Sequence, residues 1–248
     1  MKNILNKLYF HPFFLIVLFI FTLIGKFKFI LYFMTLIIVH EIGHISVALM
    51  FEWKIDKVII LPFGGLTKFN ELINRPLIEE FFVSIAGVVF QIIFFKIISS
   101  KINYDYFSFI NYFIIIFNML PIYPLDGSKL LNVILNKLTS FKKSLILTVI
   151  LSYIAIIILA LLLFNVNKVV ISILLFLLQS VGKLHKQKDL IFNKFLLERY
   201  LNKFNFKKEK TINNMNNMKK DYRHIFFIDG KYLTESTFLT KYFDISIK

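Results

Sequence analysis

Apolar residues gather in six runs along the chain, and polar segments that carry lysine separate most of them. A helix needs about 20 mainly apolar residues to cross the hydrocarbon core of a bilayer. Each run has that length or comes near it, so the pattern predicts an all-α polytopic membrane protein with six transmembrane helices. The runs are Leu8–Gly25, Phe29–Phe51, Phe81–Ile98, Tyr106–Leu120, Leu145–Phe164 and Val166–Val181.

The lysines between the runs predict how the helices are oriented. Cytoplasmic loops of membrane proteins carry an excess of Lys and Arg. If the N-terminus is inside, the outer loops carry only Lys26, Lys28, Lys101 and Lys168, and most other basic residues fall on the inner side. We therefore expect both termini to be cytoplasmic, and the second run to end at the cytoplasmic face.

The loop Lys57–Thr67 is more apolar than an ordinary cytoplasmic connection. Two short β-type stretches flank Pro62 and the pair Gly64 and Gly65, a pattern that predicts a β-hairpin. Its apolar character favours a membrane-associated hairpin, and a plain connector is the alternative. An extended substrate could pair with the edge of such a hairpin, which makes Gly64 and Gly65 candidate substrate-binding residues.

Composition agrees with a membrane protein. The chain has 248 residues, 57% of them hydrophobic, and no cysteine, and its mean hydropathy is +0.70. Half of the basic residues behind the net charge of +15 lie after Val181, so we expect a basic tail beside anionic lipid and no nucleic-acid partner. We predict a membrane domain at 1–182 and a small cytoplasmic α/β tail at 183–248, with a linker at Lys207–Lys220.

One polar motif interrupts the second apolar run. Phe29–Phe51 is 23 residues long, and its only ionisable residues are His40, Glu41 and His44, which form an H-E-x-x-H pattern. Residues four apart share one face of a helix, so the two histidines can offer their nitrogens to one metal ion. Ionisable side chains at bilayer depth are costly without partners. The motif therefore predicts a zinc site with Glu41 as its general base.

The third ligand has to come from another part of the chain, and Asp126 is the candidate. It follows two prolines, Pro121 and Pro124, and precedes Gly127, at the inner end of the fourth run. Irregular backbone at membrane depth is tolerated mainly where it lines a cavity. Two histidines and one carboxylate are a known catalytic zinc set. From its position alone, Asp126 could equally cap the next helix.

Together, H-E-x-x-H in an early span and N-x-x-P-x-x-P-L-D-G after a later one resemble the site-2 protease family of intramembrane zinc proteases. The resemblance implies zinc ligands at His40, His44 and Asp126 and a catalytic glutamate at Glu41. It also implies a substrate-handling role for Asn118 and Pro124. Ser128 and Lys129 depart from the residues that follow D-G in many relatives.

The layout of six spans without an inserted PDZ domain is most similar to the sporulation branch of that family. This resemblance implies cleavage of a membrane-associated pro-sigma factor near the cytoplasmic face, in the membrane around the forespore with the site facing the mother cell. It also implies inhibitory membrane-protein partners. Members of the branch carry a nucleotide-sensing CBS domain, and the tail at 183–248 resembles a shortened, degenerate version of one, so ATP at the tail is left open.

The sequence leaves other functions open. A membrane anti-sigma factor is the alternative substrate, and a homo-oligomer is left open. A metal-ion transporter is the alternative of a different class, but it would carry polar ligands in several spans, often in repeated halves. The centres of the first, fifth and sixth runs contain no charged residue. A zinc-binding scaffold without activity is a further alternative, and the intact Glu41 argues against it.

Overall fold

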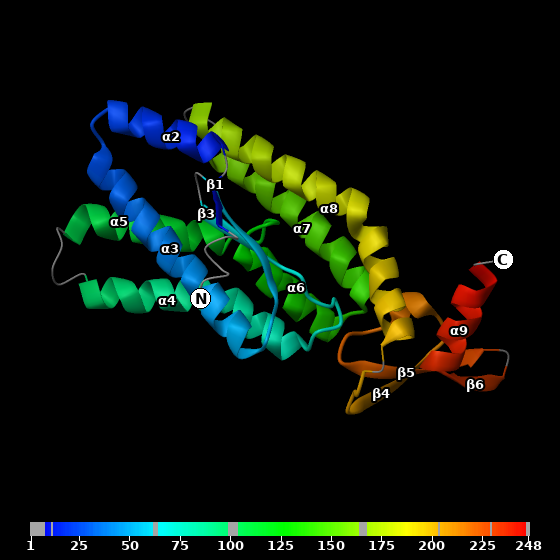
Figure 1. Ribbon diagram of the computed structural model, residues 1–248. Helices are drawn as coiled ribbons and strands as arrows, with labels where there is room; N and C mark the ends of the chain where they lie inside the picture. Colours follow the sequence, from blue (N-terminus) through cyan, green and yellow to red (C-terminus); the bar gives the residue numbers. More distant parts are fainter. Residues whose placement is uncertain are drawn as a thin grey trace. The chain divides into compact units, whose positions relative to one another are not determined.

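The computed structural model describes residues 8–10, 12–61, 64–98, 104–163, 168–202, 204–228 and 230–246 (Figure 1). Contacts divide the chain into two units, which are described one at a time. The first comprises Met1–Glu71 and Phe81–Leu120, and the second comprises Leu72–Glu80 and Pro121–Lys248. Pro62 and Lys101, which entered the predictions above, lie outside the described residues.

The first unit combines helices with a small sheet. In chain order its elements are β1 (Leu8–Phe10), α2 (Pro12–Leu23), α3 (Phe27–Met50), β2 (Ile55–Leu61), β3 (Gly64–Phe69), α4 (Leu77–Ile98) and α5 (Tyr104–Asn118). The first residues of α4 belong to the second unit. The strand order is β1-β2-β3, with β1 parallel to β2 and β2 antiparallel to β3. A hairpin therefore lies directly after the helix that carries the H-E-x-x-H motif.

The start of the first predicted span differs from the expectation. Residues Leu8–Phe10 form β1 and pair with Val58–Ile60 of β2, and the helix begins only at Pro12. Proline suits the first turn of a helix and disfavours helical backbone in the residue before it. The backbone groups of β1 are instead satisfied by pairing with β2, a partner far away in the sequence.

The core of the first unit joins the sheet to the motif helix. Leu36 and Ile37 of α3, Ile60 of β2 and Ile110 of α5 are each at most 1% exposed and lie in one hydrophobic cluster. Burying a large aliphatic side chain contributes roughly 1.5–3 kcal/mol. The cluster thus holds the hairpin and α5 against the helix that carries the candidate site.

Three helices of the described residues are long and apolar enough to cross a membrane, namely α3, α4 and Phe141–Leu162. They expose large apolar side chains such as Leu31, Ile93 and Leu161, which suits contact with lipid. The helices α2 and α5 are shorter, with 12 and 15 residues. The protein is an integral membrane protein of mostly helical fold, and the number of six spans stays a prediction.

The second unit contains α6 (Asp126–Leu138), α7 (Phe141–Leu162), α8 (Lys168–Leu201), β4 (Lys208–Ile212), the 3₁₀ helix η1 (Met215–Asn217), β5 (Tyr222–Ile228), β6 (Lys231–Thr234) and α9 (Glu235–Ser246). Helices α7 and α8 run side by side (Figure 1). Helix α8 has 34 residues and continues past Val181 without a break. The predicted domain boundary at 182 therefore falls inside a helix, and the division itself stays a prediction.

The tail is more ordered than its composition indicates. The segment Lys207–Lys220, expected to be a linker, contains β4 and η1. Strand β4 pairs parallel to β5, and β5 pairs antiparallel to β6. Ile212 and Met218 are buried in one core with Phe141, Phe195 and Phe226. Two apolar side chains in a polar stretch are enough to anchor it, because they join a core that α7 and α8 supply.

Candidate metal centre

The three motif residues lie on one buried stretch of α3. His40, Glu41 and His44 are 2%, 4% and 3% exposed. Their helix is otherwise almost wholly apolar, so its polar atoms need partners from neighbouring elements. Those partners come from α4, α5 and the hairpin, all within the first unit.

Helix α4 orients both imidazoles. The Nδ1 atom of His44 lies 2.6 Å from the carbonyl oxygen of Val83, and Nδ1 of His40 lies 3.1 Å from Oε1 of Gln91. A carbonyl oxygen can only accept, so each Nδ1 donates its proton and each Nε2 keeps its lone pair. Outer partners of this kind fix the tautomer and orientation of metal-binding histidines.

Gln91 is itself held in place by α5. Its Nε2 donates to the backbone oxygen of Asn111 at 3.2 Å and to Oδ1 of Asn111 at 3.1 Å. Because both oxygens of Asn111 accept from the amide nitrogen of Gln91, the amide oxygen of Gln91 has to face His40. Gln91 is 0% exposed, which makes this chain of contacts a buried, directed support for the first histidine. Gln91 was not among the expected site residues.

The spacing of the two histidines fits zinc. Their Nε2 atoms lie 3.1 Å apart, and both are lone-pair atoms by the tautomers just derived. Two nitrogens at about 2.0–2.1 Å from a tetrahedral zinc ion lie about 3.3–3.4 Å apart. The two atoms are thus already spaced nearly as a shared zinc ion requires, and His40 and His44 fit as two of its ligands.

Gly87 gives these two nitrogens their space. A Cβ on Gly87 would overlap Nε2 of His44 and would lie 2.6 Å from Nε2 of His40. Gly43 of α3 makes a similar approach, since its Cβ would lie 2.6 Å from the backbone oxygen of Ala86. Small residues let membrane helices pack closely, and Gly43 permits such a contact between α3 and α4. The position of Gly87 beside the histidines was not among the expected site features.

The hairpin covers Glu41. The Thr67 hydroxyl of β3 donates a hydrogen bond to Oε2 of Glu41, and a Cβ on Gly65 would overlap the same carboxylate. Glu41 is therefore oriented by one hydrogen bond and packed against backbone that lacks a side chain. Thr67 was not among the expected site residues. The substrate-binding roles of Gly64 and Gly65 stay predictions.

The remaining candidates lie at the ends of α5 and α6. Asn118 is buried at the end of α5, where its Nδ2 donates to the carbonyl oxygen of Ile114 at 3.0 Å. Asp126 is 5% exposed and opens α6 in the second unit, where Nζ of Lys129 lies 2.8 Å from its Oδ1. The N-cap of α6 is Leu125, so Asp126 is not the cap that the alternative interpretation required.

The segment before Asp126 is braced by α7. The backbone N–H of Tyr123 donates to Oγ of Ser152 at 3.2 Å, and that hydroxyl donates to the carbonyl oxygen of Pro121 at 3.3 Å. The Tyr123–Pro124 peptide bond is cis. Pro124 thus lies in a segment whose backbone is tied to a neighbouring helix. Whether it handles substrate stays a prediction.

Comparisons with known proteins agree with this geometry. The family model "Peptidase family M50" matches residues 28–104 and 98–164. Stage IV sporulation protein FB of Bacillus subtilis is 34% identical over 212 residues, which cover 81% of this chain and 74% of that protein. A zinc metalloprotease of Methanocaldococcus jannaschii is 31% identical over 125 residues, or 47% of this chain and 36% of that protein.

A solved structure shares the fold. The site-2 protease from Methanocaldococcus jannaschii matches with a TM-score of 0.56 and 24% identity, over 71% of this chain and 89% of that one. At this identity the likeness concerns the fold alone. The backbone of this chain, with its helices and hairpin, is thus arranged as in that protease.

Proposed function

Because this chain belongs to peptidase family M50, the site-2 proteases, and is a zinc metalloprotease, we propose that it cuts a membrane-associated protein close to the cytoplasmic face of the bilayer. The observation that carries the proposal is the pair of Nε2 atoms, 3.1 Å apart, beside the buried Glu41. A substrate held there would meet a metal position and a general base together.

His40 and His44 would hold zinc together with Asp126 as the third ligand. Support for Asp126 comes from its burial, from its carboxylate chemistry and from the cap position, which Leu125 occupies instead. Two histidines and a carboxylate leave one tetrahedral position for water. When bound, zinc is a Lewis acid that activates water and polarises a carbonyl group.

Glu41 moves the proton in this proposal. Thr67 occupies Oε2, so Oε1 accepts the proton of the water that attacks the scissile carbonyl carbon. Oε1 then delivers that proton to the amide nitrogen as the C–N bond breaks. The glycine at position 65 leaves space beside this oxygen. Asn118 and Pro124 are proposed to hold the unwound substrate, and the hairpin edge at Gly64 and Gly65 is proposed to pair with it.

The proposed substrate is a pro-sigma factor processed during sporulation. Support comes from the identity of 34% to a sporulation protein over most of both chains. In this proposal both termini are cytoplasmic, and the protein lies in the membrane around the forespore with its site toward the mother cell. Inhibitory membrane-protein partners and homo-oligomers stay predictions. ATP is not part of this proposal.

The test is co-expression with candidate pro-sigma and membrane anti-sigma factors, comparing wild type with Glu41→Gln. Glu41→Gln should keep zinc and lose cleavage, because only the proton acceptor is removed. Glu52→Gln is the matched control, since Glu52 is exposed just beyond α3, and it should cleave normally. Processing by Glu41→Gln at the wild-type rate would remove Glu41 from the mechanism.

Asp126 needs its own measurement. Metal analysis of purified Asp126→Ala should show much less zinc than wild type, whereas Asp126→Asn should retain part of it through the remaining oxygen. Full zinc occupancy in Asp126→Ala would exclude Asp126 from the ligand set.

Orientation can be tested on α3 alone, because the chain has no cysteine. Lys28 and Glu52 are exposed at opposite ends of this helix. Glu52→Cys should react with an impermeant thiol reagent from the cytoplasmic side, and Lys28→Cys from the opposite side. The reverse pattern would overturn the proposed orientation.

A further inference from the structure

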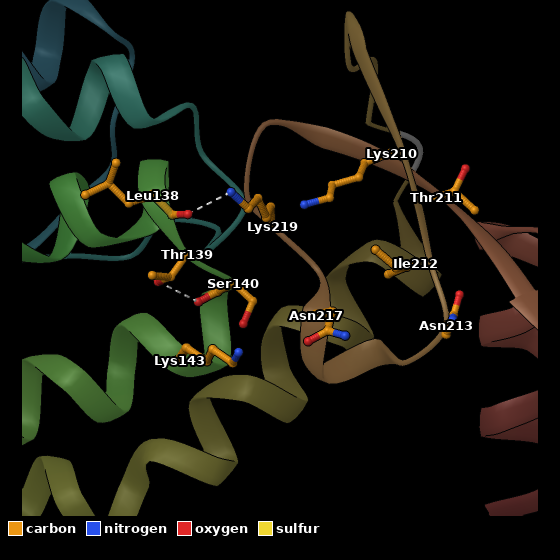
Figure 2. A pocket seen from close by; sticks show the side chains of 10 residues that line it. All are labelled: Leu138, Thr139, Ser140, Lys143, Lys210, Thr211, Ile212, Asn213, Asn217 and Lys219. Atoms are coloured by element: carbon orange, nitrogen blue, oxygen red, sulfur yellow. Dashed lines mark hydrogen bonds between the residues drawn. The ribbon is translucent and has the colours of Figure 1, made fainter.

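A cavity of about 480 Å³ lies in the second unit, at the turn between α6 and α7. Figure 2 shows Ser140 and Lys143 from the start of α7 on one side of it and Lys210 from β4 on the other. Asn217 and Lys219, from the end of η1 and the segment after it, also line it. Segments far apart in the sequence thus supply its donors.

The cavity carries positive charge that its own lining does not neutralise. Lys143, Lys210 and Lys219 line it, and no acidic residue is among the described residues that do so. Burial, together with the charge of Lys210, lowers the pKa of the Lys219 ammonium group. Glu209, the acid next to Lys210, lies 3.9 Å from Arg223. An anion in the cavity would offset a repulsion that these lysines otherwise impose on one another.

The start of α7 gives a second, independent indication. Its N-cap is Ser140, whose side chain makes no capping hydrogen bond. The Ser140 hydroxyl is buried, with the residue 6% exposed, and it has no hydrogen-bond partner. The first turn of α7 has no acid and contains Lys142 and Lys143, the reverse of what the helix dipole favours.

We propose that this cavity is a binding site for a phosphate group, held by Ser140, Lys143 and Lys210 at the positive end of α7. A helix N-terminus favours an anion, and hydroxyl and ammonium donors are suited to phosphate oxygens. A buried hydroxyl without a partner gains a hydrogen bond from such an oxygen. Lys142 is not included, because its ammonium group contacts Oδ1 of Asn216 at 3.2 Å and lies over the Phe192 ring.

Two sources can present this chemistry. Helix α7 is a candidate membrane span that begins at Phe141, so the cavity lies at the end of a span, where lipid head groups are found. A free phosphate compound from the aqueous side is the second source. The inference does not depend on protease activity, so it can fail or hold independently of the proposed function.

The first test is calorimetric binding to the purified full chain in zwitterionic detergent, with dioctanoyl phosphatidic acid in one arm and inorganic phosphate in the other. Wild type should bind one equivalent in at least one arm. Lys143→Gln with Lys210→Gln should weaken binding at least tenfold. The control is Lys183→Gln with Lys186→Gln, which removes the same charge from exposed positions on α8 and should leave the affinity within twofold.

The two arms identify the source. Binding of the lipid with weak or no binding of inorganic phosphate assigns the site to head groups, and binding of both shows that phosphate alone suffices. Equal loss in the cavity and control variants would overturn the proposal, because it would show unspecific charge attraction. Absence of binding in both arms would overturn it as well.

Ser140→Ala separates a ligand site from a structural cap. In buffer without phosphate this variant should melt at or above the wild-type temperature, because it removes a buried hydroxyl without a partner. A saturating ligand raises the melting temperature of a protein whose folded state binds it, and this rise should be smaller in Ser140→Ala. A lower melting temperature without ligand and an unchanged ligand effect would return Ser140 to a capping role.

Discussion

Buried histidines of the two units have different kinds of partners. The first unit contains the pair His40 and His44, and the second contains His224. In the first unit, the Nε2 atoms of His40 and His44 lie 3.1 Å apart, and their Nδ1 atoms contact Oε1 of Gln91 and the carbonyl oxygen of Val83. In the second unit, His224 is 0% exposed, its Nδ1 lies 3.1 Å from Glu235, and its Nε2 accepts the backbone N–H of Lys219 at 3.0 Å. Both ring nitrogens of His224 therefore have partners within the tail.

The partner of His224, Glu235, belongs to a buried network of charged residues in the tail. Arg199 lies 3.0 Å from Glu235 and also donates to the backbone oxygens of Lys219 and Tyr222. Removal of one member of a buried ion network is costly, because it leaves the remaining charge buried without compensation. The histidines of α3 instead have two lone pairs converging on one point. The contacts of both ring nitrogens of His224 within the tail are typical of a structural cluster. The two Nε2 atoms of His40 and His44, which converge on one point, are typical of a site that can bind a ligand.

The change with the largest expected effect is Gly87→Ala. Its methyl group would overlap the Nε2 atoms of His40 and His44, so zinc content should fall to background. Displacement of reacting groups by about 1 Å can cost roughly 10²-fold in rate, and we expect at least that loss of cleavage. Metal analysis and a cleavage assay measure both.

Gly182→Ala is the control for helix propensity. A Cβ there meets only the Tyr153 hydroxyl, at 3.9 Å, so zinc and activity should be unchanged. Normal zinc content in Gly87→Ala would show that the histidines are not confined as described.

Arg199→Met should damage the tail and leave the metal centre intact. It leaves the buried Glu235 without its arginine partner, a kind of loss that typically costs about 3–5 kcal/mol. Hydrogen exchange should accelerate in peptides from β4, β5 and α9. The only tryptophan, Trp53, packs in the first unit, and its fluorescence transition should stay where it is in wild type.

Arg223→Met is the matched control, since Arg223 is exposed and lies 3.9 Å from Glu209. Exposed pairs of this kind contribute about 0–1 kcal/mol. Equal exchange in the two arginine variants would show that the tail network is not a stabilising cluster.

Gln91→Leu should weaken zinc binding without unfolding the protein. It removes the acceptor of the His40 Nδ1 proton, and loss of such an outer partner typically costs about 10–100-fold in metal affinity. Competition with a chromogenic chelator measures that affinity. Asn132→Leu removes a comparable neutral contact, to the Thr148 hydroxyl at 2.9 Å, and should not change it. The same affinity in both variants would contradict the orienting role of Gln91.

The smallest expected effect is a pH dependence of the tail. Burial lowers the pKa of His224, with the hydrogen bond to Glu235 opposing and the charges of Arg199 and Lys210 adding to that shift. Below its ordinary value of 6.5, the unfolded chain therefore binds a proton that the folded tail does not. The free energy of unfolding of the tail should fall as the pH drops through this range.

Glu235 should extend that loss to lower pH. Burial would raise its pKa, but hydrogen bonds and charge from His224 and Arg199 outweigh burial and lower it. Its contribution is then lost below its ordinary value of 4.5. Hydrogen exchange of β5 peptides from pH 7 to 5 should show the first loss in wild type and much less in His224→Gln. His185→Gln, on an exposed position of α8, should behave as wild type.

The sequence by itself determined the features that depend on local spacing. The pattern H-E-x-x-H puts His40 and His44 on one face of a helix, and an apolar run around three ionisable residues indicates a membrane-embedded site. Periodicity is a property of a single segment, so these features needed no knowledge of the partner elements.

Tertiary structure decided everything that depends on a distant partner. Val83, Gln91 and Thr67 contact the motif from 39, 51 and 26 residues away, and no spacing rule selects them among other polar residues. The strand β1 and the order of segment Lys207–Lys220 were missed for the same reason. A short strand is stable only when another strand pairs with it, and a polar segment is ordered only when a core elsewhere buries its few apolar side chains.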